Sequence, residues 1–184
     1  SACSSVETQV AKPEWTLLIH GGAGVMRRAE MTPEMDAAYR AGLNDALDAG
    51  SKILSGGGLA VDAVEAAVRV LEDNPNFNAG RGAVLTREGV AGLDASNMDG
   101  RDSKAGAVAQ VRTVKNPIGA ARLVMDTTGR VMFAGKAVDE MAARAGLEIV
   151  PPEYFVTPRR LDALKRAMAG NWEAMDRHGT VGAV

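Results

Sequence analysis

The final stretch, His178-Gly179-Thr180-Val181-Gly182-Ala183-Val184, places a threonine directly after a glycine, at the start of a run of small and β-branched residues. Cleavage of the Gly179–Thr180 bond would give Thr180 a free α-amine, with an ordinary pKa of roughly 7.7–8.0. Such an amine can act as the base for the threonine's own hydroxyl. Gly179 suits a scissile position because it lacks a Cβ and leaves its carbonyl open to attack. The same letters also describe an ordinary turn into a buried strand, so the rest of the chain must decide.

The composition is typical of one globular domain with a sizeable core. Of the 184 residues, 46% are hydrophobic and 24% are charged. The formal net charge of −2 gives no electrostatic case for nucleic acid or for an anionic membrane. Aromatic residues make up only 4% of the chain, too few for a platform of stacked bases. No apolar run approaches the roughly 20 residues of a membrane span.

The N-terminus contains the only cysteine, Cys3, so neither an internal disulfide nor a cysteine-based metal site is expected. Ser1-Ala2-Cys3 resembles the end of a bacterial lipoprotein signal, which would make the protein periplasmic or lipid-anchored. The alternative is a trimmed or disordered tail with an incidental cysteine on a cytoplasmic protein. We expect residues 1–14 to be a disordered lead-in or an export remnant.

The first half of the chain predicts a strand and two helices. A continuous apolar run at 15–19 is expected to be a buried strand entering a glycine loop at 20–24. Thr32 and Pro33 then start a helix that ends at glycines 56–58. A second helix begins near Ala60 and ends at Asn74-Pro75, before a shaped loop at 76–82. The expected apolar faces are Met35, Tyr39, Leu43, Leu47 and Leu54 in the first helix, and Val61, Val64, Val68 and Leu71 in the second.

The second half predicts a sheet and further helices. Asp99-Gly100 is expected to be a turn between two strands, and Asn116-Pro117 to open a helix. The expected strands are 83–86, 90–94, 106–114 and 131–133. The expected helices run from 117 through 125, over 136–145 and from 158 to about 172. Residues 173–179 are expected to be an exposed linker. This mixture predicts an α/β or α+β fold with a sheet between helical layers.

The glycine loop after the first strand suggests two enzyme classes that the chain does not otherwise support. A dinucleotide or phosphate loop would need a third glycine or a following lysine, and both are missing. The oxyanion loop of an α/β-hydrolase would need a Gly-x-Ser-x-Gly elbow, which the chain lacks. From the residues alone, His20 is expected to be partly buried and bonded to local backbone.

Three carboxylates and one asparagine were considered as ligands. Asp94, Asp99 and Asp102 are close in sequence, but His20 and His178 have no metal-ligand spacing. We therefore expect Asp94 and Asp99 to hold backbone amides at turns and strand ends. Asn78 could donate to a ligand oxyanion, although stabilising its own loop is the simpler interpretation.

The loop from Leu71 to Gly82 is expected to turn tightly and leave several carbonyl oxygens without ladder partners. Such a loop can wrap a hard monovalent or calcium-like cation, or water.

Taken together, five ordered segments resemble the plant-type asparaginases, also called isoaspartyl peptidases, of the N-terminal-nucleophile hydrolase superfamily. The resemblance covers Trp15 to Val184. Its segments are LLIHGGAG, LEDNPNFNAGRGAVLT, LDASNMDGRDSKAGAVAQV, KNPIGAARLVM and GTVGAV.

The resemblance implies roles for individual residues. Thr180 is expected to be both the autoproteolytic and the catalytic nucleophile, with Gly179 as the residue before the cut. Asn78 is expected to help position Thr180, and His20, Gly21 and Gly22 to form an active-site loop. A sodium ion, or potassium, is expected in the 71–82 loop, held by main-chain oxygens of Leu71, Glu72, Asn74, Phe77, Ala79 and Arg81. No organic cofactor is expected.

The family fold is a four-layer αββα sandwich, assembled as a dimer of αβ heterodimers. By this resemblance, 15–179 is the α-subunit portion of one hydrolase domain, and 180–184 begins the β subunit. The expected activity is hydrolysis of β-aspartyl dipeptides and L-asparagine, only together with the β subunit. The related glycosylasparaginases usually carry an aspartate before the threonine, where this chain has Gly179. A second hypothesis is a non-catalytic α/β binding module that keeps the fold and is never cleaved.

Overall fold

The computed structural model describes residues 14–22, 29, 31–170 and 179–184. Its helices are α1 (Pro33–Ser55), α2 (Ala60–Asp73), α3 (Pro117–Thr127), α4 (Lys136–Arg144) and α5 (Pro158–Met168), and its strands are β1 (Ile19–His20), β2 (Leu93–Met98), β3 (Ala105–Val111), β4 (Met132–Ala134) and β5 (Gly182–Ala183). Two short 3₁₀ helices cover Gly80–Gly82 and Pro152–Phe155. The predicted mixed α/β fold is confirmed. The lead-in at 1–13 and most of the expected linker lie outside the described residues.

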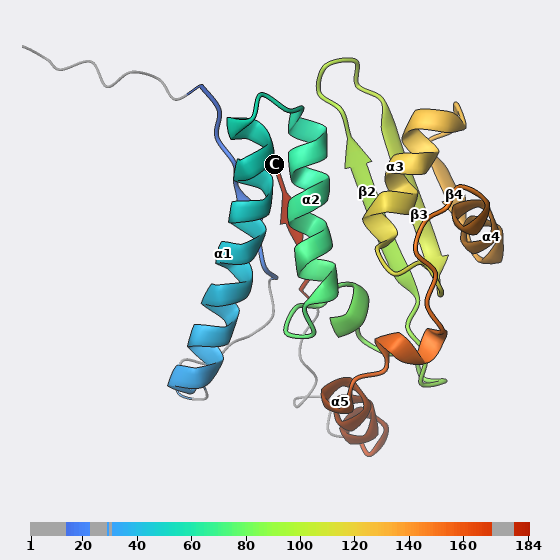
Figure 1. The fold of residues 1–184 in the computed structure, drawn as a ribbon. Coiled ribbons are helices and arrows are strands. Elements are labelled where there is room, and N and C mark those ends of the chain that lie inside the picture. The colour runs from blue at the N-terminus through green and yellow to red at the C-terminus, as the bar shows by residue number, and fades with distance from the viewer. Residues whose placement is uncertain (1–13, 23–28, 30, 171–178) are drawn as a thin grey trace, which may run out of the picture.

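Helices α1 and α2 pack side by side, with β1 and β5 against them (Figure 1). The predicted start of α1 is confirmed, since the Thr32 hydroxyl accepts the Met35 N–H at 3.2 Å and Pro33 follows in the first turn. The expected apolar face of α1 is confirmed in part: Tyr39 and Leu43 pack against the core, but Met35 is 42% exposed and the most deeply buried residues of α1 are Gly42, Ala46 and Gly50. These small residues let the two backbones approach, and a Cβ on Gly50 would lie 3.0 Å from the Ala63 carbonyl oxygen.

Strands β1 and β5 form an antiparallel pair, with Ile19 opposite Ala183 and His20 opposite Gly182. Leu18 extends the ladder through two backbone hydrogen bonds with Val184, at 2.7 and 2.9 Å. The prediction of a buried strand at 15–19 is therefore wrong in extent. Ile19 packs into the core, but Leu18 is 62% exposed. Successive side chains of a strand point to opposite faces, and the described residues cover only the Ile19 face of this pair.

The second sheet has the order β2-β3-β4. Strands β2 and β3 form a hairpin whose predicted turn is confirmed, because the Asp99 and Lys104 backbones pair across it. Strand β4 runs parallel to β3 after the crossover through α3. The expected strands 83–86 and 90–94 are reduced to one bridge between Leu85 and Ala91, and β2 starts only at Leu93. The left-handed φ of +78° at Gly89 turns the chain tightly there, which leaves little room for a ladder.

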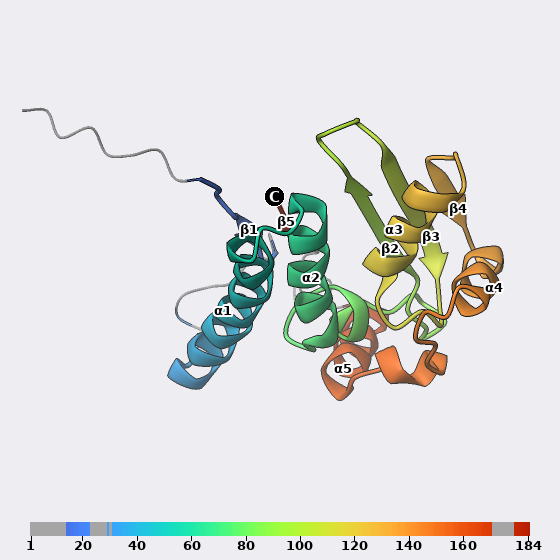
Figure 2. The ribbon, with the colours of Figure 1, turned by 45° about the horizontal axis from the view of Figure 1, so that its top comes forward.

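The larger core lies between this sheet and helices α3 and α4, and α5 lies apart from the sheet near the end of α2 (Figures 1 and 2). Phe155 and Val108 are among its fully buried side chains. Asp139 at the start of α4 accepts backbone N–H groups at the end of β3, including that of Thr113 at 2.8 Å, and so ties the helix to the sheet. None of the helices in the described part of the chain is long and apolar enough to cross a membrane.

Candidate active site

The Gly179–Thr180 peptide lies just before the strand that pairs with β1. Because His20 faces Gly182 in the ladder, the glycine loop that follows His20 approaches the residues that precede Gly182. The two segments are far apart in sequence, and the antiparallel pairing alone brings them together. Thr180 is exposed and Gly179 is half-buried. The candidate nucleophile is therefore accessible while the peptide bond before it is held against the protein.

Asn78 contacts the carbonyl that precedes the candidate nucleophile. Its side-chain Nδ2 donates to the Gly179 carbonyl oxygen at 2.5 Å. Its Oδ1 accepts the backbone N–H of Val84 at 2.9 Å. The second contact decides the orientation of the amide, because only an oxygen can accept from that N–H and the donor must then face Gly179. Asn78 can thus donate to negative charge that develops on the Gly179 oxygen.

Two glycines shape the approach to this peptide. A Cβ on Gly22 would lie 3.6 Å from the Gly179 Cα, and the residue has a left-handed φ of +129°. A Cβ on Gly21 would meet Leu43 and Phe77 at 3.0 and 3.1 Å. Both positions therefore need glycine, one for its backbone conformation and the other for its packing.

His20 does not match the expectation from the residues alone. It was expected to be partly buried and bonded to local backbone, but the structure places it exposed on β1, opposite Gly182. Its position in a two-stranded ladder turns its side chain away from the face that Ile19 occupies. His178, the other histidine, lies outside the described residues.

The loop after α2 curls tightly on itself. At the end of α2 the last carbonyls lack helical partners and carry the negative end of the helix dipole. Gly80 has a φ of +47°, and a Cβ there would collide with the Glu72 carbonyl. A Cβ on Gly82 would collide with the Phe77 carbonyl and lie 2.8 Å from that of Pro75. The carbonyl oxygens of Glu72, Pro75 and Phe77 therefore lie close to these two glycines, and oxygen is the ligand type that a hard cation takes. Within the same loop the Asn74 and Ala79 oxygens accept the N–H groups of Phe77 and Gly82, at 3.2 and 2.9 Å.

Two arginines of α5 hold other carbonyls of the same loop. The Arg160 Nε donates to the Gly82 oxygen at 2.5 Å, and the Arg159 Nη1 donates to the Asn76 oxygen at 3.4 Å. Neither Asn76 nor Gly82 belongs to the set of oxygens expected to bind the ion. In these two contacts the guanidinium groups thus use carbonyl oxygens of the loop other than those expected to bind the cation.

Glu72 at the end of α2 connects this loop to α3. Its Oε1 accepts the Ile118 N–H at 2.9 Å, while Oε2 is buried with no hydrogen-bond partner among the residues that the structure describes. Burial raises the pKa of Glu72 to about 8 because it disfavours the charged form, and the Ile118 N–H opposes this only in part. Asn116 adds a second connection, donating to Asp73 at 3.0 Å.

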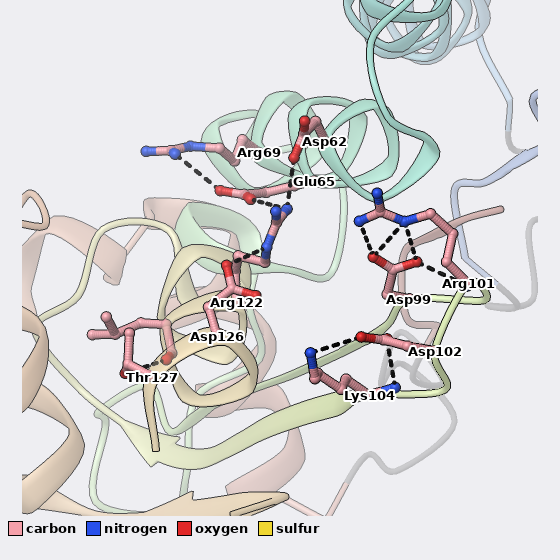
Figure 3. A network of polar contacts seen from close by, with 11 residues as sticks. Asp62, Glu65, Arg69, Asp99, Arg101, Asp102, Lys104, Arg122, Asp126 and Thr127 are labelled. Carbon is pink, nitrogen blue, oxygen red and sulfur yellow. Dashed lines mark hydrogen bonds and ion pairs between the residues drawn. The ribbon is translucent and has the colours of Figure 1, made fainter. Parts of the chain in front are cut away.

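The acidic residues near the hairpin turn do what the sequence predicts. Asp99 accepts the backbone N–H of Arg101 and Asp102 that of Lys104, at 3.0 and 3.1 Å, and both carboxylates also pair with those side chains (Figure 3). Asp94 accepts the Gln110 N–H at 2.8 Å. The Arg101 contacts lower the pKa of Asp99 to about 2. The predicted structural role of Asp94 and Asp99 is confirmed, and the described residues contain no cluster of metal-binding side chains.

Between α2 and α3, Figure 3 shows a second group of charges. Arg122 on α3 reaches Asp62 at 2.8 Å and Glu65 at 3.4 Å on α2, and Asp126 on its own helix. These ion pairs join α3 to α2, so they belong to the framework that supports the candidate site.

Two contributors to the site were missed from the sequence. Val84 acts through its backbone N–H, a group that every residue except proline carries, so its residue type does not indicate this role. Arg160 is 3% exposed, and the sequence predicts only a helix from 158 to about 172 there. A signal for it existed, because Arg159 and Arg160 stand in the first turn of α5, where the helix dipole disfavours cations. Basic residues at that end indicate contacts outside the helix.

Comparison with known proteins supports the resemblance. The family model described as Asparaginase matches residues 13–184. An isoaspartyl peptidase of Salmonella typhimurium is 43% identical over 178 residues, which cover 91% of this chain and 57% of the relative. An isoaspartyl peptidase/L-asparaginase of Mus musculus is 41% identical over 172 residues, with 91% and 52% covered. Another of Xenopus laevis is 42% identical over 171 residues, with 91% and 54% covered. The chain therefore spans about half the length of these relatives.

Proposed function

Because this chain belongs to the asparaginase family, we propose that it cleaves itself before Thr180 and that the product hydrolyses β-aspartyl amide bonds. The observation that carries the proposal is the Asn78 amide donating to the carbonyl of Gly179, the residue directly before Thr180. A turn that merely enters a strand needs no such donor from a loop 101 residues away.

Self-cleavage would proceed by an N→O acyl shift. The Thr180 Oγ attacks the Gly179 carbonyl carbon, and its proton passes to the departing amide nitrogen. The negative charge that develops on the Gly179 oxygen is stabilised by the Asn78 N–H donor. Water then hydrolyses the resulting ester, which leaves a carboxylate on Gly179 and a free α-amine on Thr180.

In the cleaved protein the same threonine would act on substrate. Its α-amine takes the hydroxyl proton, and Oγ attacks the side-chain carbonyl of L-asparagine or the β-linked carbonyl of an isoaspartyl dipeptide. The tetrahedral intermediate then expels ammonia or an amino acid, whose nitrogen takes the proton from the α-amine, and leaves an acyl-enzyme. Water hydrolyses this ester and releases L-aspartate. These two substrates follow the names of the relatives, isoaspartyl peptidase and L-asparaginase.

A monovalent cation would stabilise the loop that presents Asn78. The main-chain oxygens proposed to hold it are those of Leu71, Glu72, Asn74, Phe77, Ala79 and Arg81. The crowding of carbonyls around Gly80 and Gly82 supports such a site. Bound there, the ion supplies charge that keeps these carbonyl oxygens together, and the residues of the loop position Asn78.

The assembly we propose is the four-layer αββα sandwich, in which the segment from Thr180 onward is the β subunit. Two αβ units would then pair as a dimer. The antiparallel pairing of β5 with β1 supports this arrangement, because it would keep the new N-terminus in place after the cut.

The test is the intact mass of the full-length gene product during incubation near neutral pH, followed by hydrolysis of β-aspartyl dipeptides. We expect two masses, one for a chain that starts at Thr180, and activity that appears as the cut proceeds. Thr180→Ala should give one uncut mass and no hydrolysis.

Cleavage and turnover by Thr180→Ala would refute the proposal. A single uncut mass for the unmodified protein, folded but without hydrolysis, would favour a non-catalytic binding module instead. Preference for N-glycosylated asparagine over β-aspartyl dipeptides would point to the glycosylasparaginase branch.

A further inference from the structure

We propose that Arg160 is a positioning residue for self-cleavage, which holds the backbone that orients the Asn78 amide toward the Gly179 carbonyl. This inference rests on the proposed self-cleavage and adds a residue of α5 to it. The contact that carries this inference is the one between Arg160 and Gly82 in the loop, so the proposed effect is transmitted through the loop.

The first step of the argument is the burial of Arg160. Its residue surface is 3% exposed, and its Nε donates to the Gly82 oxygen at 2.5 Å. A buried guanidinium is costly to desolvate and is retained where its contacts compensate for that cost. The position in the first turn of α5 adds to the cost, because the positive end of the helix dipole lies there. Helix stability alone therefore does not explain this arginine.

The second step is a short series of contacts between Arg160 and the scissile bond. Arg160 holds the carbonyl of Gly82, and the Val84 N–H follows two residues later. That N–H donates to the Asn78 Oδ1 at 2.9 Å, and the Asn78 Nδ2 donates to the Gly179 oxygen at 2.5 Å. If Gly82 moves, the Val84 N–H moves with it and the amide of Asn78 loses the contact that sets its orientation.

The third step is that Gly82 cannot hold its own position through packing of a side chain. It has none, and its place is set by the Phe77 and Pro75 carbonyls that crowd it. Arg160 supplies a charged donor to the Gly82 carbonyl, and such a hydrogen bond is stronger than one between neutral groups. Arg159 supports the opposite side of the loop through Asn76 and the Tyr39 hydroxyl, at 3.4 and 3.2 Å.

The experiment follows the first-order appearance of the chain that starts at Thr180, by intact mass, in the full-length protein. The variants are Arg160→Met, Arg160→Lys and, as the matched control, Arg166→Met on the exposed face of the same helix. We expect Arg160→Met to slow cleavage at least tenfold, since small displacements of catalytic groups cost this much or more. Arg160→Lys keeps a cationic donor and should recover part of the rate. Arg166→Met should stay within about twofold.

A structural readout separates positioning from general loss of stability. Crystal structures of Thr180→Ala and of Thr180→Ala combined with Arg160→Met keep the scissile bond intact in both. We expect the Asn78 Nδ2 to lie within 3.5 Å of the Gly179 oxygen in the first and beyond hydrogen-bond distance, or rotated away, in the second. If Arg160→Met does not fold, Arg160→Lys takes its place in this comparison, with a smaller displacement expected.

The outcomes distinguish this inference from the proposed function. Cleavage at the unmodified rate in folded Arg160→Met, or an unchanged Asn78 contact in the paired crystal structures, would overturn the role of Arg160 while leaving self-cleavage intact. No cleavage of the unmodified protein would refute the proposed function itself. Slow cleavage in Arg160→Met with partial recovery in Arg160→Lys and a displaced Asn78 amide would support the inference.

Discussion

The two halves of the structure are stabilised in different ways. The half with β2, β3 and β4 buries large side chains, with Phe155 fully enclosed between the sheet and its helices. The half with α1, α2, β1 and β5 has a smaller core, in which Leu71 and Phe77 are buried beside Ala46 and Ala67, and α1 also buries two glycines. The candidate active site lies in this half. Strand β5 packs closely against α2. The loop that contains Asn78 is held instead by hydrogen bonds from side chains of α5.

This difference shows which interactions fix the positions of the groups in the candidate active site. Large apolar side chains stabilise the sheet without regard to the orientation of any one amide. In the site half, positions are set by directional contacts such as those of Asn78 and Arg160, because hydrogen bonds depend on angle and distance. Glu72 connects the two halves, since it ends α2 and accepts from the first turn of α3.

The largest effect on stability is expected from Phe155→Ala. Removing this fully buried ring should lower the free energy of unfolding by about 3–5 kcal/mol. Self-cleavage of the fraction that remains folded should keep its rate, because the ring belongs to the sheet half. Urea denaturation and intact mass measured together check both parts. A cleavage rate that falls as steeply as stability would show that the two halves are not separable.

Phe77→Ala makes the matching change in the site half. Phe77 is 2% exposed and packs edge-on against Tyr39, with ring centroids 5.8 Å apart. We expect a loss of about 3 kcal/mol, and also a cleavage rate at least tenfold lower, because the neighbouring residue is Asn78. The same two measurements apply. A folded variant that cleaves at the normal rate would contradict the view that this core positions the loop.

Glu72→Gln tests the connection between the halves through pH. The pKa of Glu72 is raised from its ordinary 4.5 to about 8, so the folded state binds the proton more tightly. Stability from this group is therefore lost as pH rises from about 4.5 to about 8. The glutamine keeps an acceptor for Ile118 but no charge, so its pH profile should be flatter and its thermal midpoint higher at pH 8.5. Thermal unfolding at constant sodium concentration measures this, and parallel profiles would refute it.

The smallest effect is expected from Asp99→Asn. Arg101 lowers the pKa of Asp99 from 3.8 to about 2. The ionised carboxylate therefore stabilises the fold at pH values above 3.8, and this stabilisation is lost as the pH falls toward 2. The variant should lose less stability between pH 4 and 2 than the unmodified protein. The difference should be small and reduced by salt, because the Arg101 side chain is 62% exposed. Acid titration followed by circular dichroism, with and without 0.5 M salt, measures it. A steeper acid transition in the variant would contradict the assignment.

Local chemistry made much of the fold predictable. Thr32, Pro33 and the glycines at 56–58 mark the ends of α1 correctly, because capping and helix termination depend on neighbours in sequence. The end of α2 before Asn74-Pro75 and the start of α3 at Pro117 were predictable for the same reason. The apolar pattern of α1 indicated Tyr39 and Leu43, which pack against the core, but not the small residues that the packing with α2 buries most deeply.

The order and type of most elements, the family, and the candidate nucleophile Thr180 with Gly179 before it could be read from the amino-acid sequence. These follow from local propensity and from motifs whose residues are contiguous. Only the tertiary structure decided that Asn78 meets the Gly179 carbonyl, that Val84 orients it, and that Arg160 is buried against Gly82. Those contacts join residues separated by up to 101 positions and use backbone groups that every residue carries, so their partners are specified by the packing of the whole chain.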